Sequence, residues 1–145
     1  MNYLKNLKQQ QPSHIYGNLE TFNFGPIICH TSLEKTFIKE LRSRGDKSNI
    51  SHNKELAGHL DIENSYNEED RKWFMYSTTH IFKNYVNKLK LSINEMGNKP
   101  PLTGVNLSAL WINYMKKSEF NPLHDHFGDI SFVIYLQVPN EIKEE

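Results

Sequence analysis

The feature that most constrains this chain is a long apolar stripe with helical spacing between residues 67 and 89. Side chains four residues apart share one face of an α-helix, so the stripe predicts a long amphipathic helix with a wide apolar face. Asn67 is a good capping residue, and the three acids after it suit the positive end of a helix. We expect the aromatic residues of this helix to be core residues that pack on a sheet. The stripe consists of Trp73, Ser77, Ile81, Tyr85 and Leu89, flanked by Phe74, Phe82 and Val86.

The chain before this helix predicts a strand, a shorter helix and a loop. Residues 1–20 are polar and aperiodic and predict a flexible lead-in, whereas residues 21–30 are strand-like, with Gly25-Pro26 as a bulge or edge position. Thr31 followed by Glu34 indicates a capping box that opens a helix, and Gly45 is expected to end it. Residues 46–65 are polar and predict a long loop. The apolar face of the shorter helix is Leu33, Phe37, Ile38 and Leu41.

The second half of the chain has the character of strands. Residues 105–115 and 130–138 are rich in strand-forming residues and carry no helix caps. Residues 116–122 are turn-prone, and Pro139 stops the later strand. Helices followed by strands predict an α+β fold, with residues 21–145 as a single domain.

Composition limits the functional classes that fit. Only 37% of residues are hydrophobic, but 12% are aromatic, and large rings bury enough area for a core. Seventeen basic and seventeen acidic residues balance, which argues against a nucleic-acid binder. The single cysteine, Cys29, excludes an internal disulfide. With no leader sequence and no apolar stretch of about 20 residues, we expect a soluble, cytoplasmic protein that does not bind membranes.

The candidate chemistry lies at His124-Asp125-His126. On an extended segment, side chains two residues apart point the same way, so both imidazoles reach one side and Asp125 the other. Neutral imidazole binds Fe, Zn, Cu or Ni well. Two surface histidines in a polar loop are the alternative. His14, His30, His52 and His80 have no partner at metal-ligand spacing.

Two segments resemble the iron(II)- and 2-oxoglutarate-dependent oxygenases, in the prolyl-hydroxylase-like branch and a group common in marine phages. They are Leu110-Trp-Ile-Asn-Tyr-Met and Asn121-Pro-Leu-His-Asp-His-Phe-Gly-Asp-Ile-Ser-Phe-Val-Ile-Tyr-Leu-Gln-Val-Pro139. The segments Phe24-Gly-Pro-Ile and Glu55-Leu-Ala-Gly-His-Leu-Asp61 also fit. The resemblance implies N-terminal helices packed on a double-stranded β-helix, or jelly roll. It further implies a dioxygenase that hydroxylates a C–H bond, with a peptidyl or protein residue such as proline as the expected substrate.

The resemblance also assigns site residues. His124 takes the first metal-ligand position. His126 stands where the family usually has an aspartate, so either His126 binds iron or Asp125 or Asp129 reaches in. Tyr114 and Tyr135, with Asn113, are the residues expected to hold 2-oxoglutarate. For the two tyrosines, the alternative is a role as half-buried core residues.

The family's distal histidine and the basic residue for 2-oxoglutarate lie beyond the second strand. The chain stops at Glu145, so we expect an oxygenase domain that is incomplete at its C-terminus and doubtful in activity by itself. Two other interpretations stay open. One is a non-enzymatic β-sandwich that serves as a phage structural or interaction module. The other is a cupin-like metal enzyme that does not use 2-oxoglutarate.

Overall fold

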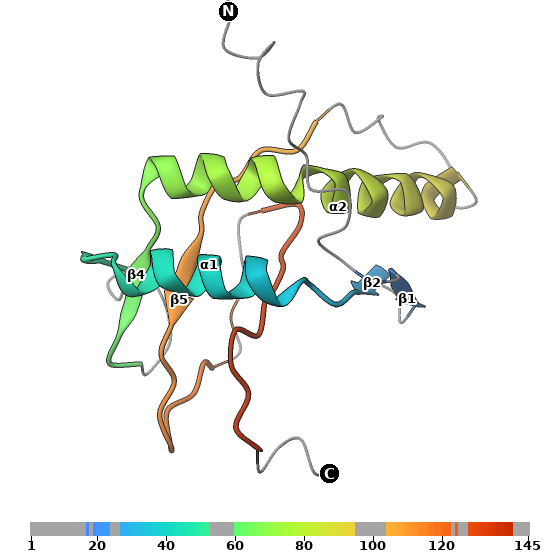
Figure 1. Cartoon of the computed structure of the whole chain (residues 1–145). Helices are drawn as coiled ribbons and strands as arrows, with labels where there is room; N and C mark the ends of the chain where they lie inside the picture. Colours follow the sequence, from blue (N-terminus) through green and yellow to red (C-terminus); the bar gives the residue numbers. More distant parts are fainter. Residues whose placement is uncertain are drawn as a thin grey trace, which may run out of the picture. The chain divides into compact units, whose positions relative to one another are not determined.

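A computed structural model of the chain describes most residues between 17 and 140 (Figure 1). The described residues are 17, 19–23, 27–52, 60–94, 104–122, 124 and 128–140. They fall into two compact units, one formed by Met1–Phe37 and Lys72–Leu107 and the other by Ile38–Arg71 and Ser108–Glu145. Each unit is described by itself below.

The first unit contains a small hairpin. Strand β1 (Glu20–Asn23) pairs antiparallel with β2 (Ile27–His30), with Glu20 opposite His30 and Asn23 opposite Ile27. The single strand predicted over residues 21–30 is therefore two strands. The predicted capping box is wrong, because the Thr31 hydroxyl donates to the Gly17 carbonyl at 3.2 Å and α1 begins only at Lys35.

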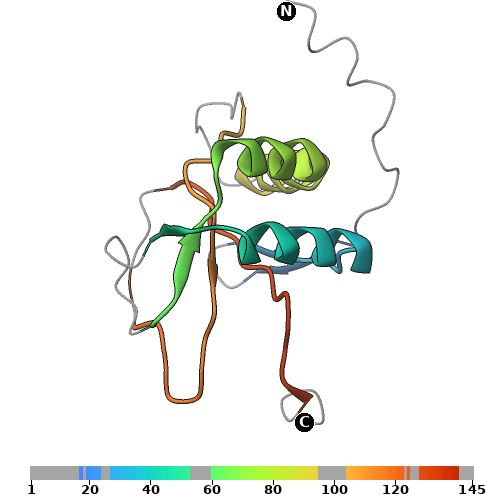
Figure 2. The same cartoon turned by 60° about the vertical axis from the view of Figure 1, so that its left-hand side comes forward.

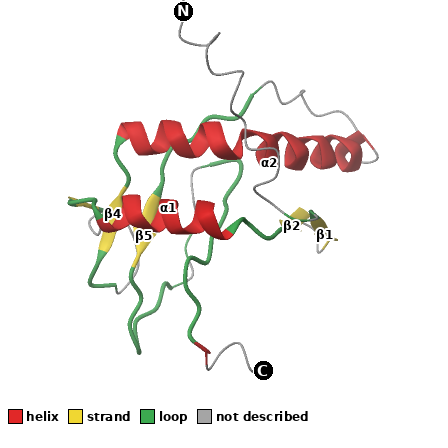
Figure 3. Cartoon of the chain, in the orientation of Figure 1, coloured by secondary structure: helices red, strands yellow, loops and turns green. Residues whose placement is uncertain are grey.

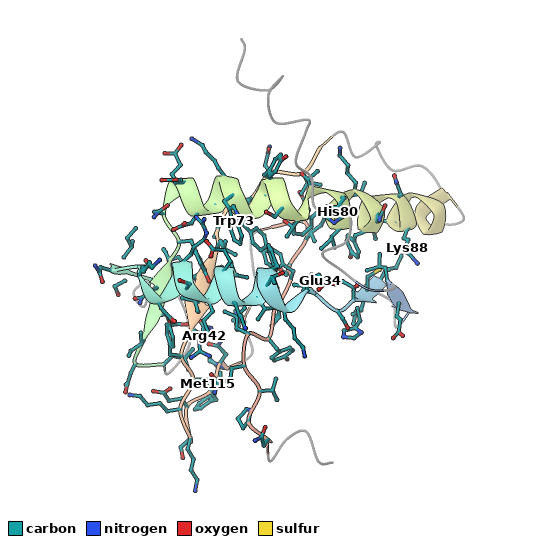
Figure 4. The ribbon with its side chains drawn as sticks, in the orientation of Figure 1. Glu34, Arg42, Trp73, His80, Lys88 and Met115 are labelled. Atoms are coloured by element: carbon teal, nitrogen blue, oxygen red, sulfur yellow. The ribbon has the colours of Figure 1, made fainter. Side chains whose placement is uncertain are left out.

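Helix α2 (Glu68–Asn94) follows the predicted pattern closely. Its start is confirmed, because the Asp70 amide donates to Asn67 Oδ1 at 2.8 Å. In the first unit, Trp73 stacks on Phe37 with 5.2 Å between ring centroids, on the side of α2 that faces the start of α1 (Figure 4). Phe74, only 1% exposed, lies 6.2 Å from Phe37 and 6.4 Å from Phe82 between ring centroids. The apolar stripe is thus a core face, as the sequence predicts.

The second unit is a three-stranded antiparallel sheet with a helix on it. Helix α1 (Lys35–Asp46) contributes most of its length to this unit, and the strands β3 (Ile50–Ser51), β4 (Glu63–Ser65) and β5 (Trp111–Asn113) are arranged in the order β3-β4-β5. β4 and β5 run side by side, and α1 crosses these strands in Figure 1 and meets them with its C-terminal end in Figure 2. The expectation of a loop over residues 46–65 is wrong for β3 and β4.

Helix α1 approaches the sheet most closely at Gly45. A Cβ atom there would lie 2.7 Å from the Tyr66 hydroxyl oxygen and 2.8 Å from the Ile112 Cδ1 atom. The same contact region includes the Tyr66 hydroxyl, which donates to the Leu41 carbonyl at 3.0 Å. Gly45 was expected to end the helix, but α1 continues to Asp46. Its role is to let the helix backbone reach the sheet.

The later strands are shorter than the sequence predicts. Residues 128–138 run without strand pairing, and Figure 3 draws them as loop, so the strand predicted over 130–138 is wrong. Only Trp111–Asn113 of the strand predicted over 105–115 is paired. A contact to α1 holds the end of the unpaired segment, because Arg42 donates to Gln137 Oε1 at 2.6 Å. The mixture of helices with small antiparallel sheets confirms an α+β fold.

Candidate functional site

The register of the three-stranded sheet divides its side chains between two faces. Residues directly opposite each other in an antiparallel pair share a face, and neighbours along a strand alternate. Ile112 and Tyr114 belong to the face that carries α1, because Ile112 approaches Gly45 and Tyr114 bonds to Asp46. The other face, which we call the Glu63 face, carries the side chains of His52, Glu63, Ser65, Trp111 and Asn113.

Glu63 lies at the centre of this face. Its side chain is fully buried, and it stands between His52, whose amide donates to the Glu63 carbonyl at 2.8 Å, and Asn113 on β5. Burial raises the pKa of the Glu63 carboxyl above its ordinary value, while the charges of His52 and then of His124 act to lower that pKa. A buried carboxyl group is therefore within electrostatic reach of two imidazoles.

His52 is held by both of its neighbours on the face. Its ring stacks on Trp111 with 5.1 Å between centroids, and its Nδ1 atom is joined by a hydrogen bond of 2.8 Å to Ser65 Oγ. Stacking and the Nδ1 bond fix the plane of the ring, so the position of Nε2 is fixed as well.

Asn113 carries a buried acceptor that is not satisfied. Its Oδ1 atom has no hydrogen-bond partner among the residues that the structure describes. A buried polar oxygen without a partner is costly, and such atoms often mark the place of a ligand or ion. Because Asn113 pairs with Glu63 in the register, this oxygen belongs to the same face as the buried carboxyl.

A backbone contact orients the ring of His124. Its Nδ1–H donates to the Pro122 carbonyl at 2.7 Å. Metal-binding histidines characteristically use their second nitrogen in this way. Asp125 and His126 lie outside the described residues, and Asp129 is exposed. Within the described residues, no three His, Cys, Asp or Glu side chains are grouped so that they could hold a metal ion.

The two tyrosines expected to hold 2-oxoglutarate lie elsewhere. The Tyr114 phenol donates to Asp46 at the end of α1, and burial together with Asp46 raises the pKa of Tyr114 to about 12. It therefore belongs to the face opposite Asn113. Tyr135 is 78% exposed in the segment without strand pairing.

Sequence reasoning missed Glu63 and set His52 aside. Both residues lie in a polar stretch. The alternation of side chains between the two faces of β4 extends over only three residues, which is too short to predict a strand. Nothing local indicates that residue 63 is buried, because β5, which pairs with it, is about 50 residues away in sequence.

Comparison of the chain with protein-family models, with curated proteins and with solved structures finds no match. No helix in the described part of the chain combines the length and apolar character needed to cross a bilayer.

Proposed function

We propose that this protein is an iron(II)- and 2-oxoglutarate-dependent dioxygenase whose metal centre lies at the Glu63 face. Its reaction would hydroxylate a C–H bond, with a peptidyl or protein residue such as proline as the substrate class. The observation that supports the proposal is the convergence of a buried carboxyl, Glu63, with an unsatisfied amide oxygen, Asn113 Oδ1, under the electrostatic influence of His124.

The donor chemistry of this face fits iron(II). Non-haem iron oxygenases bind their metal through two histidines and one carboxylate and leave positions open. The motif at residues 124–126 has histidine where a carboxylate is usual, and Glu63 would supply that carboxylate from β4. His124, His126 and Glu63 are then the residues that would hold the metal. Asn113 Oδ1 would accept a hydrogen bond from a molecule bound beside it.

Bound iron would supply the redox chemistry that couples decarboxylation of 2-oxoglutarate to hydroxylation. The chain's own residues orient and protect the site. The Pro122 carbonyl fixes the ring of His124, and burial keeps water from the Glu63 carboxyl. Ser65 and Trp111 hold the ring of His52 beside that carboxyl.

The test is an anaerobic titration of the protein with iron(II) and 2-oxoglutarate. We expect a weak visible charge-transfer band in the wild type and its loss in His124→Ala, because that variant removes a metal donor. His30→Ala is the matched control, since His30 on β2 is exposed, belongs to the first unit and lies 3.8 Å from Glu20. Glu63→Gln should weaken iron binding as well.

Other outcomes would contradict the proposal. Tight metal binding that does not respond to 2-oxoglutarate would favour a cupin-like metal protein. Absence of metal binding would favour a structural or interaction module. Equal bands in His124→Ala and His30→Ala would remove the assignment of residue 124.

A further inference from the structure

A polar hollow opens beside the Glu63 face, at the end of β4. Its volume is about 210 Å³, smaller than the sites of drug-sized ligands. All of its lining belongs to the second unit. The lining residues are Ile50, Ser51, His52, Ser65, Tyr66, Arg71, Ser108, Ala109 and Leu110.

Among the described residues that line the hollow, Arg71 in the first turn of α2 is the one Lys or Arg, and none is an Asp or Glu. Among the residues that the structure describes, the Arg71 guanidinium forms no ion pair and no hydrogen bond, although its neighbour Asp70 pairs with Arg44 at 2.7 Å. A partly buried cation thus lines a space to which the described residues contribute hydrogen-bond donors but no carboxylate.

We propose that the hollow binds a small oxyanion, the phosphate or carboxylate group of a small molecule, with Arg71 as its anchor. The planar guanidinium presents paired N–H donors that match two oxygens of such a group. Ser108, whose hydroxyl has no partner in the described part of the chain, offers a further donor. Ser65 and His52, joined by a hydrogen bond of 2.8 Å between Oγ and Nδ1, add two further polar side chains to the lining.

A small oxyanion fits the hollow better than the other classes of ligand. A cation would be repelled by Arg71, and no carboxylate among the described lining residues would offset that repulsion. An apolar ligand would leave the guanidinium and the serine hydroxyls without hydrogen bonds in a less hydrated site, which is unfavourable. The proposal requires no metal and does not depend on the function proposed above.

The experiment is a titration of the whole chain with inorganic phosphate in the presence of a chelator, followed by calorimetry and by amide chemical shifts. We expect binding in the millimolar range or tighter, with the largest shifts at Ser65, Arg71 and Ser108. Arg71→Gln should weaken binding by roughly 10- to 100-fold, the loss expected for charge-assisted hydrogen bonds. Lys72→Gln is the matched control, since it removes the same charge from an exposed position next along α2 and should change affinity less than about twofold.

Parallel titrations with acetate and succinate distinguish the source of the oxyanion. Binding of phosphate alone assigns the hollow to phosphorylated molecules, and binding of all three assigns it to oxyanions in general. The proposal is overturned if phosphate and the carboxylates all fail to bind, or if Arg71→Gln and Lys72→Gln lose affinity equally. Circular dichroism of Arg71→Gln, which removes no side-chain hydrogen bond or ion pair between described residues, verifies that the variant is folded.

Discussion

Glu63 is a buried carboxyl group that the fold holds at an energetic cost. Moving a carboxylate out of water is unfavourable, and here the histidine charges offset only part of that cost, so the pKa of Glu63 stays raised. Buried groups whose pKa is shifted are often retained for function at a cost in stability. The free energy of unfolding should therefore depend on the ionisation of Glu63.

Glu63→Gln is expected to stabilise the metal-free protein at neutral pH. The pKa of Glu63 is raised in the folded state, so protonation of this carboxyl stabilises the folded protein. This contribution is complete below the unfolded-state pKa of about 4.5 and is lost as the pH rises through the folded-state pKa. The variant should therefore exceed the wild type in free energy of unfolding at pH 7 and lose this advantage near pH 4. Urea unfolding with a chelator present measures both.

A matched carboxyl with the opposite shift serves as the control. Asp61, next to β4, is exposed and pairs with Lys116 at 2.6 Å, and this partner lowers the pKa of Asp61. Asp61→Asn should leave stability unchanged or slightly reduced at pH 7. If both variants shifted stability in the same direction, burial of Glu63 would not be the cause.

Some residues of the candidate site can be recognised in the sequence, and others cannot. The two histidines at 124 and 126 are visible because they lie two residues apart. Glu63, His52 and Asn113 come from three separate segments, and only strand pairing brings them to one face. A carboxylate that long-range pairing supplies has no local signature, so the sequence suggested Asp125 or Asp129 instead.

At the scale of elements, Gly45 determines how closely α1 packs on β4 and β5. Gly45→Ala would place a methyl group 2.7 Å from the Tyr66 hydroxyl oxygen and 2.8 Å from Ile112 Cδ1. Alanine would otherwise favour the helix by roughly 1 kcal/mol. Overpacking typically costs about 1–3 kcal/mol, so we expect a net loss in the free energy of unfolding.

Urea denaturation of Gly45→Ala and of Lys39→Ala, at an exposed position of α1, tests this. The Lys39 variant should remain within about 0.5 kcal/mol of the wild type. A Gly45 variant more stable than the wild type would show that the packing of α1 on the sheet does not depend on the missing side chain.

Helices were easier to predict than strands for a physical reason. The stripe of α2 and its Asn67 cap are local signals, and both are confirmed. A strand exists only where a partner pairs with it. The polar residues of β4 pair on both sides, whereas the strand-forming residues 130–138 have no neighbouring strand in the described part of the chain. Residue composition therefore gave no sign of the strand at β4, and it wrongly predicted a strand over residues 130–138.

At the scale of the whole molecule, the candidate chemistry is confined to one unit. The Glu63 face, His124 and the Arg71 hollow all belong to Ile38–Arg71 and Ser108–Glu145. The first unit contributes the hairpin and most of α2, with a core around Phe37 and Phe74. The α+β class was predicted from an order of helices before strands, whereas four of the five described strands precede α2 in the structure. A double-stranded β-helix was an expectation from resemblance, because its strand pairings cannot be read from local pattern.

Metal binding should reverse the effect of Glu63 on the stability of the whole chain. A ligand that binds only the folded state stabilises it by about 2.7 kcal/mol at 100 times its dissociation constant. Cobalt(II), a redox-stable substitute for iron(II), should therefore raise the unfolding temperature of the wild type and of His30→Ala but not of His124→Ala. Glu63→Gln should be the more stable protein with a chelator and the less stable one with saturating cobalt(II). If this order stayed the same with and without metal, Glu63 would not be a ligand, and its burial would need a different explanation from the metal centre proposed here.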